Sequence, residues 1–190
     1  MLITEEVQII SGYAKGELVG ALLLGEGARR TRDVFLRTHL LRHAAEEMQH
    51  AAYFADLLEA SAAELLDVRD EAGEHFYARA GKPDSDVALL AMTEAFEPYV
   101  ARHYQAHMMA TDVPGVRSLL EKILTEEATH AWCTEWLDHV NDQATVLAAR
   151  TRYRSLMHEV YDGELVRCSA RGGLAEKIAT SSRSLAGSKK

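Results

Sequence analysis

The chain has 190 residues, of which 47% are hydrophobic and three are prolines, and its formal net charge is −8. This length suits one domain with a substantial core, and no basic patch is dense enough to indicate a nucleic-acid partner. The two cysteines form no CxxC pair, which excludes a disulfide framework and a cysteine-rich iron module. We see neither a signal peptide nor an apolar run long enough to span a bilayer, so we expect a cytoplasmic protein without a membrane partner.

The first third of the chain predicts a helical hairpin. A first helix is expected to start after Thr4 and to end near residues 25–28, with two glutamates in its first turn. A second helix is expected from about Val34 to the low sixties, with Thr31 or Asp33 as its N-cap. The loop between them is short, which favours antiparallel packing of the two helices.

The rest of the chain predicts a crossover, two further long helices and a C-terminal helix. Residues 67–84 contain glycine and proline, and they are long enough to run back along a bundle, with a short helix on the way. Three more helices are then expected, at about residues 86–110, 116–140 and 144–161. We therefore expect a helical domain over residues 1–168 and a polar, loosely ordered tail over residues 169–190.

Two ExxH segments carry the main chemical signal. On a helix, residues three apart lie on one face, so each segment points a carboxylate and an imidazole in the same direction. Each segment also follows a single glutamate by thirty residues. The predicted metal ligands are Glu17, Glu47, His50, Glu97, Glu127 and His130. Four carboxylates with two imidazoles form the ligand set of di-iron and di-manganese helical bundles.

The positions of the turns support this prediction. Two antiparallel helices bring ligands to one height only if the ligands lie equally far from the turn between them. The midpoint between Glu97 and Glu127 is residue 112, inside the turn-forming segment 111–115. The midpoint between Glu17 and Glu47 is residue 32, again in an expected loop. The two halves align without a gap at an offset of 80 residues, which indicates an internal repeat of one hairpin.

Two further residues are candidate ligands. Glu94 lies three residues before Glu97 on the same helix face, and we expect either an additional or alternate ligand or an uncoordinated carboxylate there. His43 lies one turn before the first ExxH segment, but Ile123 occupies the matching position of the repeat, so the bundle does not require a histidine there. Pro98 removes the hydrogen bond to the carbonyl of Glu94, which predicts a kink or bulge in this helix.

Small and aromatic residues near the predicted ligands suggest a substrate pocket. Glycine inside a helix costs about 0.5–1 kcal/mol relative to alanine, so its presence beside a ligand indicates close packing or space for a substrate. The predicted pocket residues are Tyr13, Gly20, Ala21, Leu24, Ala101 and Tyr104.

Residues 46–51 and 123–130 resemble the second and fourth helices of bacterioferritins and rubrerythrins, within the ferritin-like superfamily of di-iron carboxylate proteins. The resemblance implies an all-α, ferritin-like four-helix bundle with a long crossover between helices 2 and 3, here with an additional C-terminal helix. It also implies two iron ions, with manganese as an alternative. Met48 stands where bacterioferritins hold an intersubunit haem, but the proline after Glu97 and the residues beyond the fourth helix depart from that family and argue against a storage cage.

Three functional classes fit these features. The first is an oxidoreductase that uses dioxygen to oxidise a small organic substrate by hydroxylation, N-oxygenation, desaturation or C–C cleavage, with electrons from an external donor. The second is iron handling, by a ferroxidase or a peroxidase of bacterioferritin or rubrerythrin type. The third is a helical interaction module without catalysis. A homodimer is the default assembly.

Overall fold

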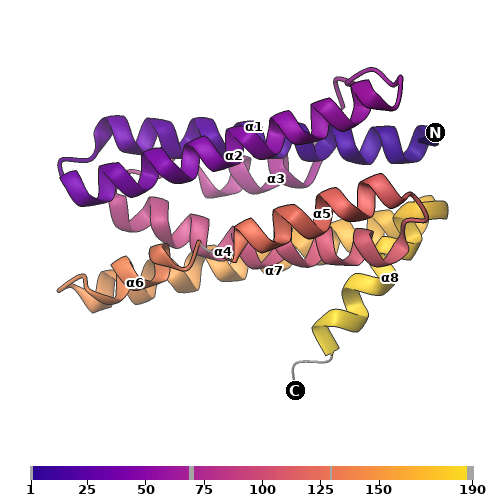
Figure 1. Cartoon of the computed structure of the whole chain (residues 1–190). Coiled ribbons are helices and arrows are strands. Elements are labelled where there is room, and N and C mark those ends of the chain that lie inside the picture. Colours follow the sequence, from indigo (N-terminus) through magenta and orange to yellow (C-terminus); the bar gives the residue numbers. More distant parts are fainter. Residues whose placement is uncertain (1, 69–70, 129, 188–190) are drawn as a thin grey trace. The chain divides into compact units, whose positions relative to one another are not determined.

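The computed structural model describes residues 2–68, 71–128 and 130–187, without the side chains of residues 71–75. The described residues form helices and no strand, which confirms the all-α class and is compatible with a ferritin-like bundle (Figure 1). The chain divides into two compact units, Met1–Gly73 and Glu74–Lys190. Each unit is described by itself below.

The first unit is the predicted hairpin of α1 (Thr4–Arg30) and α2 (Val34–Ala60). The predicted N-cap is confirmed at Asp33, whose side chain accepts a hydrogen bond of 3.0 Å from the backbone N–H of Leu36. Near the other end of the hairpin the rings of Tyr13 and Phe54 lie 5.4 Å apart. The buried apolar side chains of the two helices form the core of this unit, and they include Ile10, Leu24, Leu36, Leu40, Phe54 and Leu58.

The second unit is built around α4. The crossover carries α3 (Glu71–Ala80) and leads to α4 (Asp86–Ala110), which Ser85 caps by accepting a hydrogen bond of 3.2 Å from the N–H of Ala88. The remaining helices are α5 (Pro114–Glu127), α6 (Trp132–Asp138), α7 (Gln143–Arg171) and α8 (Gly173–Gly187). Helix α4 contacts each of α5, α6, α7 and α8, so it is the central helix of this unit.

The same contacts close both hairpin turns. A guanidinium nitrogen of Arg37 donates to the carbonyl of Thr31 at 2.6 Å, and Arg117 donates to the carbonyl of Thr111 at 2.7 Å. Each threonine hydroxyl also accepts the backbone N–H two residues later, at 3.2 Å and 3.1 Å. Because these pairs are 80 residues apart, the turns of the two units repeat one local structure, as the internal repeat predicts.

The helix predicted over residues 116–140 is interrupted in the structure. Helix α5 ends at Glu127 and α6 begins at Trp132, so His130 lies in the turn between them. Here the N–H of His130 donates to the carbonyl of Glu127 at 3.1 Å, and the N–H of Cys133 donates to the carbonyl of His130 at 3.4 Å. These three-residue hydrogen bonds replace the four-residue bonds of a regular helix and tighten the chain.

The C-terminal region also differs from the prediction of a loosely ordered tail. Helix α7 continues to Arg171, Gly172 adopts a positive φ of 76°, and α8 follows. The modest apolar stripe of α8 is buried, with Leu174, Ile178 and Ala179 against the unit, and the hydroxyls of Tyr161 and Ser182 lie 2.5 Å apart. This stripe is buried because α8 contacts both α4 and α7.

Pro98 lies inside α4, which continues through it. We expect Pro98→Ala to raise the free energy of unfolding by about 1–3 kcal/mol, because alanine restores an N–H donor to the carbonyl of Glu94. Urea unfolding followed by circular dichroism measures the change. Pro114→Ala is the control: Pro114 is at the start of α5, where proline has no such cost, and it should bring no gain.

Candidate metal centre

The first unit gathers four of the predicted ligands in one buried cluster. Glu17 of α1 and Glu47 and His50 of α2 each offer a ligand atom, and these atoms lie within 4.8 Å of one another. His50 Nδ1 is 3.8 Å from Glu17 Oε2 and 3.9 Å from Glu47 Oε2. His43 Nε2 lies 2.8 Å from the other oxygen of Glu47. The regular spacing of α2 thus directs His43, Glu47 and His50 to one place.

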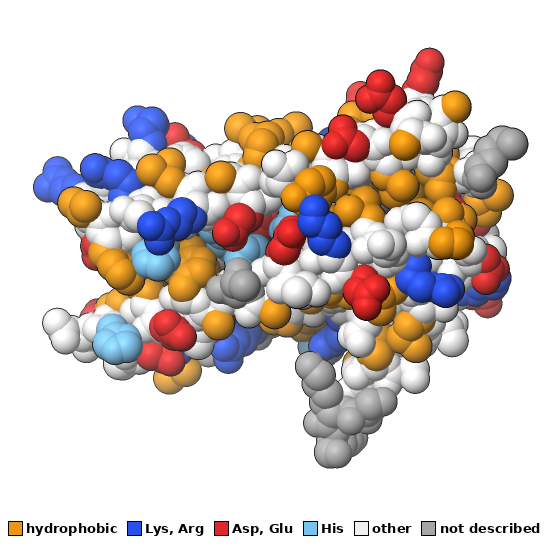
Figure 2. Space-filling model, in the orientation of Figure 1, with side chains coloured by type: hydrophobic (Ala, Val, Ile, Leu, Met, Phe, Trp, Pro, Cys, Tyr) orange, Lys and Arg blue, Asp and Glu red, His pale blue; other side chains and the backbone are white. Residues whose placement is uncertain are grey.

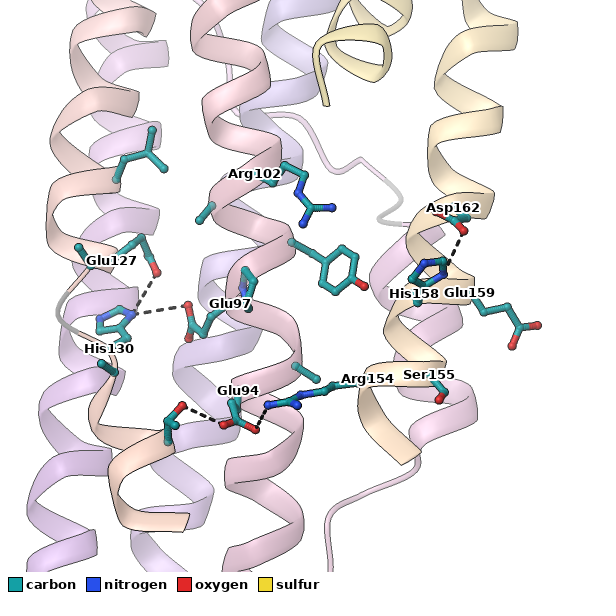
Figure 3. A pocket seen from close by; sticks show the side chains of 18 residues that line it. Glu94, Glu97, Arg102, Glu127, His130, Arg154, Ser155, His158, Glu159 and Asp162 are labelled. Atoms are coloured by element: carbon teal, nitrogen blue, oxygen red, sulfur yellow. Dashed lines mark hydrogen bonds and ion pairs between the residues drawn. The ribbon is translucent and has the colours of Figure 1, made fainter. Parts of the chain in front are cut away.

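The second unit gathers three more, Glu97, Glu127 and His130. His130 Nδ1 lies 3.0 Å from Glu127 Oε2 and 3.6 Å from Glu97 Oε2 (Figure 3). Burial lowers the pKa of His130, but hydrogen bonds and charge attraction from Glu127 and Glu97 outweigh it and raise this pKa to about 10. The imidazole is therefore protonated at neutral pH, and its positive charge offsets the two carboxylates of this cluster.

Both clusters fit a metal cation. Iron and zinc bonds to imidazole or carboxylate are about 2.0–2.2 Å long, so two donors at right angles on one ion are about 3 Å apart. The spacings of 3.0 Å and 3.6 Å around His130 are close to this value. Those of 3.8 Å and 3.9 Å around His50 are wider, but they are shorter than the roughly 4.2 Å between two donors on opposite sides of an ion. Oxygen and imidazole donors without a thiolate suit iron or manganese better than a structural zinc site. Each unit offers two carboxylates and one imidazole for such an ion.

Glu94 has different partners from Glu97. Its carboxylate is only 8% exposed and accepts hydrogen bonds from Arg150 Nε at 2.9 Å and Arg154 Nη2 at 3.1 Å. Thr134 Oγ1 donates to the same carboxylate at 2.9 Å (Figure 3). Glu94 therefore ties α4 to α6 and α7, one helical turn away from the carboxylate that contacts His130.

We expect Glu94→Gln to lower the free energy of unfolding by about 2 kcal/mol, since the neutral amide weakens the charged hydrogen bonds from Arg150 and Arg154, although Asp138 still pairs with Arg150. Chemical denaturation of the metal-free protein measures this change. Glu159→Gln is the matched control. It breaks a glutamate–arginine pair of 2.7 Å with Arg79 that is exposed on both sides, and it should leave stability unchanged. Equal effects of the two substitutions would contradict the role assigned to Glu94.

The predicted pocket residues fall in both units. In the first unit Ala21 and Leu24 are buried, Tyr13 contacts Phe54, and a Cβ atom on Gly20 would lie 4.0 Å from the Glu47 carboxylate. In the second unit Tyr104 is buried and Ala101 lines an open pocket of about 1280 Å³. The pocket also reaches Glu97, Glu127 and His130.

The wall of this pocket contains residues that the sequence did not single out. They come from α4 and from the exposed face of α7, and include Tyr99, Arg102, Arg154, His158, Glu159 and Asp162 (Figure 3). The sequence predicted only the apolar face of the fifth long helix. Residues 154, 158 and 162 are four apart, so the sequence could have predicted a polar face on this helix. The position of that face beside the ligands depends on packing against α4 and could not be predicted.

The helices and the two clusters define an all-α protein with buried carboxylate and histidine groups arranged as for metal binding. In sequence, the chain is similar to the 3-demethoxyubiquinol 3-hydroxylase of Paracidovorax citrulli (strain AAC00-1), with 35% identity over 115 residues. The match covers 58% of this chain and 56% of that protein, so the chain spans little more than half the length of this curated relative. No family model matches the chain.

Proposed function

We propose that the chain is a di-iron hydroxylase, an oxidoreductase that uses dioxygen to add a hydroxyl group to a small organic substrate. The observation that carries this proposal is the gathering of two carboxylates and one imidazole in each unit, with the imidazole nitrogen 3.0–3.9 Å from the carboxylate oxygens. The similarity to a hydroxylase supports this reaction among those that a di-iron protein performs. The name of that relative makes a quinol ring the first substrate class to test.

Each cluster would hold one ion, through Glu17, Glu47 and His50 in the first unit and through Glu97, Glu127 and His130 in the second. Iron supplies the redox chemistry that activates dioxygen, with electrons from an external donor. The union of the two clusters in one di-iron centre stays a prediction of the internal repeat.

The chain itself contributes charge balance and orientation. The carboxylates offset the positive charge of the ions, and around Glu17, Glu47 and His50 the buried surroundings limit the access of water. His43 holds one oxygen of Glu47 at 2.8 Å and so orients the carboxylate whose other oxygen faces His50. His130 has to release a proton before its Nδ1 can act as a ligand, because only neutral imidazole has a lone pair to donate.

Iron handling is a second candidate function, and one observation favours it. The pocket that reaches Glu97 and Glu127 is open and is lined by further acidic side chains, Glu159 and Asp162 among them. Such a lining attracts cations more readily than an apolar substrate. In that case ferrous iron would be the substrate of the second cluster.

One experiment separates the two functions. The protein is loaded anaerobically with ferrous iron, mixed with a quinol substrate and a chemical reductant, and exposed to isotopically labelled dioxygen. A hydroxylase should retain two irons per chain and give a product with one labelled oxygen atom. Growth of a ferric mineral without labelled product would overturn the proposal and assign the protein to iron handling.

Gly20 offers a test of space beside Glu47. Gly20→Ala should stabilise α1 by about 0.5–1 kcal/mol and lower kcat/KM by about tenfold, because the added methyl lies 4.0 Å from the Glu47 carboxylate. Gly16→Ala is the matched control, since a Cβ atom there meets nothing within 4 Å. It should give the same gain in thermal stability and leave turnover unchanged. Equal turnover of the two variants would exclude a role for this space.

A further inference from the structure

The half of the hairpin that includes the turn between α1 and α2 presents apolar side chains to solvent. In this part of the first unit Leu22 is 61% exposed, Val34 70%, Phe35 62% and Leu41 54%. Single exposed apolar residues are common on soluble proteins, but four large ones within 20 residues are not. Their position at one end of the hairpin therefore indicates a surface that is covered in use.

The same segment is basic within an acidic protein. Residues 22–42 contain five arginines and two acidic residues, whereas the whole chain has a formal net charge of −8. Both acidic residues have structural partners: Glu26 pairs with Arg29 at 2.7 Å, and Asp33 caps α2. Within the described part of the chain, Arg32 and Arg42 make no hydrogen bond or ion pair. Figure 2 shows Lys and Arg side chains beside hydrophobic ones at this end of the hairpin.

The order of these residues along α2 follows the pattern of a helix at a lipid interface. Val34 and Leu41 are seven residues apart and share one face. Arg42 lies beside Val34, at roughly 80° around the helix axis. Arg37, at roughly 60° on the other side, donates to the carbonyls of Ala28 and Thr31. The inward face of the same helix is occupied by buried leucines. A strip of apolar residues flanked by arginines, which extend their charges toward lipid headgroups, is typical of helices that bind membrane surfaces.

We propose that this surface binds an anionic lipid membrane. We call it the basic tip and define it by Leu22, Val34, Phe35, Leu41 and the two arginines that make no hydrogen bond or ion pair among the described residues of this segment, Arg32 and Arg42. Anionic headgroups match the arginines, and the headgroup boundary accepts the apolar side chains. Contact between the tips of two copies would instead bring like charges together. The proposal replaces the expectation of a protein without a membrane partner, and it does not depend on the metal chemistry.

The contact is with the surface and does not involve a transmembrane span. Among the described helices, α1 is long and apolar enough to cross a bilayer, with a mean hydropathy of 1.2 in its best window, 39% of which is buried. However, α1 packs along α2 and carries the buried carboxylate of Glu17 in its middle. A charged group at the centre of a span is costly. We therefore assign the lipid contact to the basic tip.

Vesicle sedimentation with the full chain tests this proposal. The protein should sediment with vesicles of phosphatidylcholine and phosphatidylglycerol, remain in solution with phosphatidylcholine alone, and be released by high salt. The double variant Arg32→Gln/Arg42→Gln should bind the anionic vesicles about thirtyfold more weakly, since each arginine near such a surface contributes about 1 kcal/mol. Phe35→Ser/Leu41→Ser should also weaken binding, without changing its salt dependence.

A matched control tests whether the loss of any two exposed apolar side chains weakens vesicle binding. Leu147→Ser/Val166→Ser removes two equally exposed side chains of α7, at 66% and 64%, and should bind vesicles as the parent protein does. Circular dichroism establishes that all variants fold. Equal binding of the parent protein to neutral and anionic vesicles, or no binding to either, overturns the proposal. A dimer in solution that Phe35→Ser/Leu41→Ser dissolves, without any vesicle binding, assigns the surface to a second copy instead.

Discussion

The Glu47→Gln variant should bind no more than one iron ion per chain and lose turnover by about 100-fold or more. Even residues that only support a ligand cost 10–100-fold when they are replaced, so about 100-fold is a lower bound for a ligand itself. Glu47 is buried between His43 and His50, and glutamine keeps its shape while removing the charge. Metal counting after anaerobic loading and a single-turnover assay with labelled dioxygen measure the two effects.

Glu46 provides the control for this substitution. It precedes Glu47 on α2 but is exposed, because neighbouring residues on a helix face different directions. Glu46→Gln makes the same chemical change one residue away and should retain two irons and full turnover. Retention of two tightly bound ions by Glu47→Gln would exclude Glu47 as a ligand.

The metal-free protein should lose stability as the pH rises from about 6.5 to 10. The pKa of His130 is raised from 6.5 to about 10 in the folded state. The stability that protonated His130 contributes is therefore fully present below its pKa in the unfolded chain. It is lost as the pH rises through its pKa in the folded protein. The loss is on the order of a few kcal/mol. Urea unfolding at several pH values measures it, and His130→Gln should flatten the profile over this window.

The same proton gives a signal on metal binding. Loading of the second cluster at pH 8 should release about one proton per chain from His130, because the ligand form is neutral. Calorimetry in two buffers with different ionisation enthalpies counts this proton. The control is His139→Gln, which alters an exposed histidine and should leave both the pH profile and the proton count as they are. A stability profile of His130→Gln that follows the parent protein would refute the assignment of this charge.

The residues of the clusters were predictable because helical periodicity and turn chemistry are local. An ExxH segment puts its two side chains on one face of any regular helix. Asp33, Ser85 and the two threonine turns end or begin helices through contacts within a few residues. These interactions involve residues that are close in sequence. The hairpins and the register of their ligands can therefore be predicted from the sequence alone.

The other features depend on contacts between distant segments. Glu94 meets Arg150 and Arg154, which follow it by 56 and 60 residues, so its partners cannot be read from the spacing around it. The break between α5 and α6 carries no proline or glycine, and Thr134 after it bonds to α4. The burial of α8 likewise depends on α4 and α7. Tertiary packing decided each of these features.

The interruption after Glu127 makes the two halves of the repeat mechanically unequal. His50 is held in the middle of a continuous helix, whereas His130 is attached to a short turn between two helix ends. The direction of the His50 side chain is thus set by a continuous helix, whereas that of His130 depends on where α5 ends. The repeat thus keeps the identities of the donors while their backbones differ, so that a symmetric ligand list coexists with an asymmetric local structure.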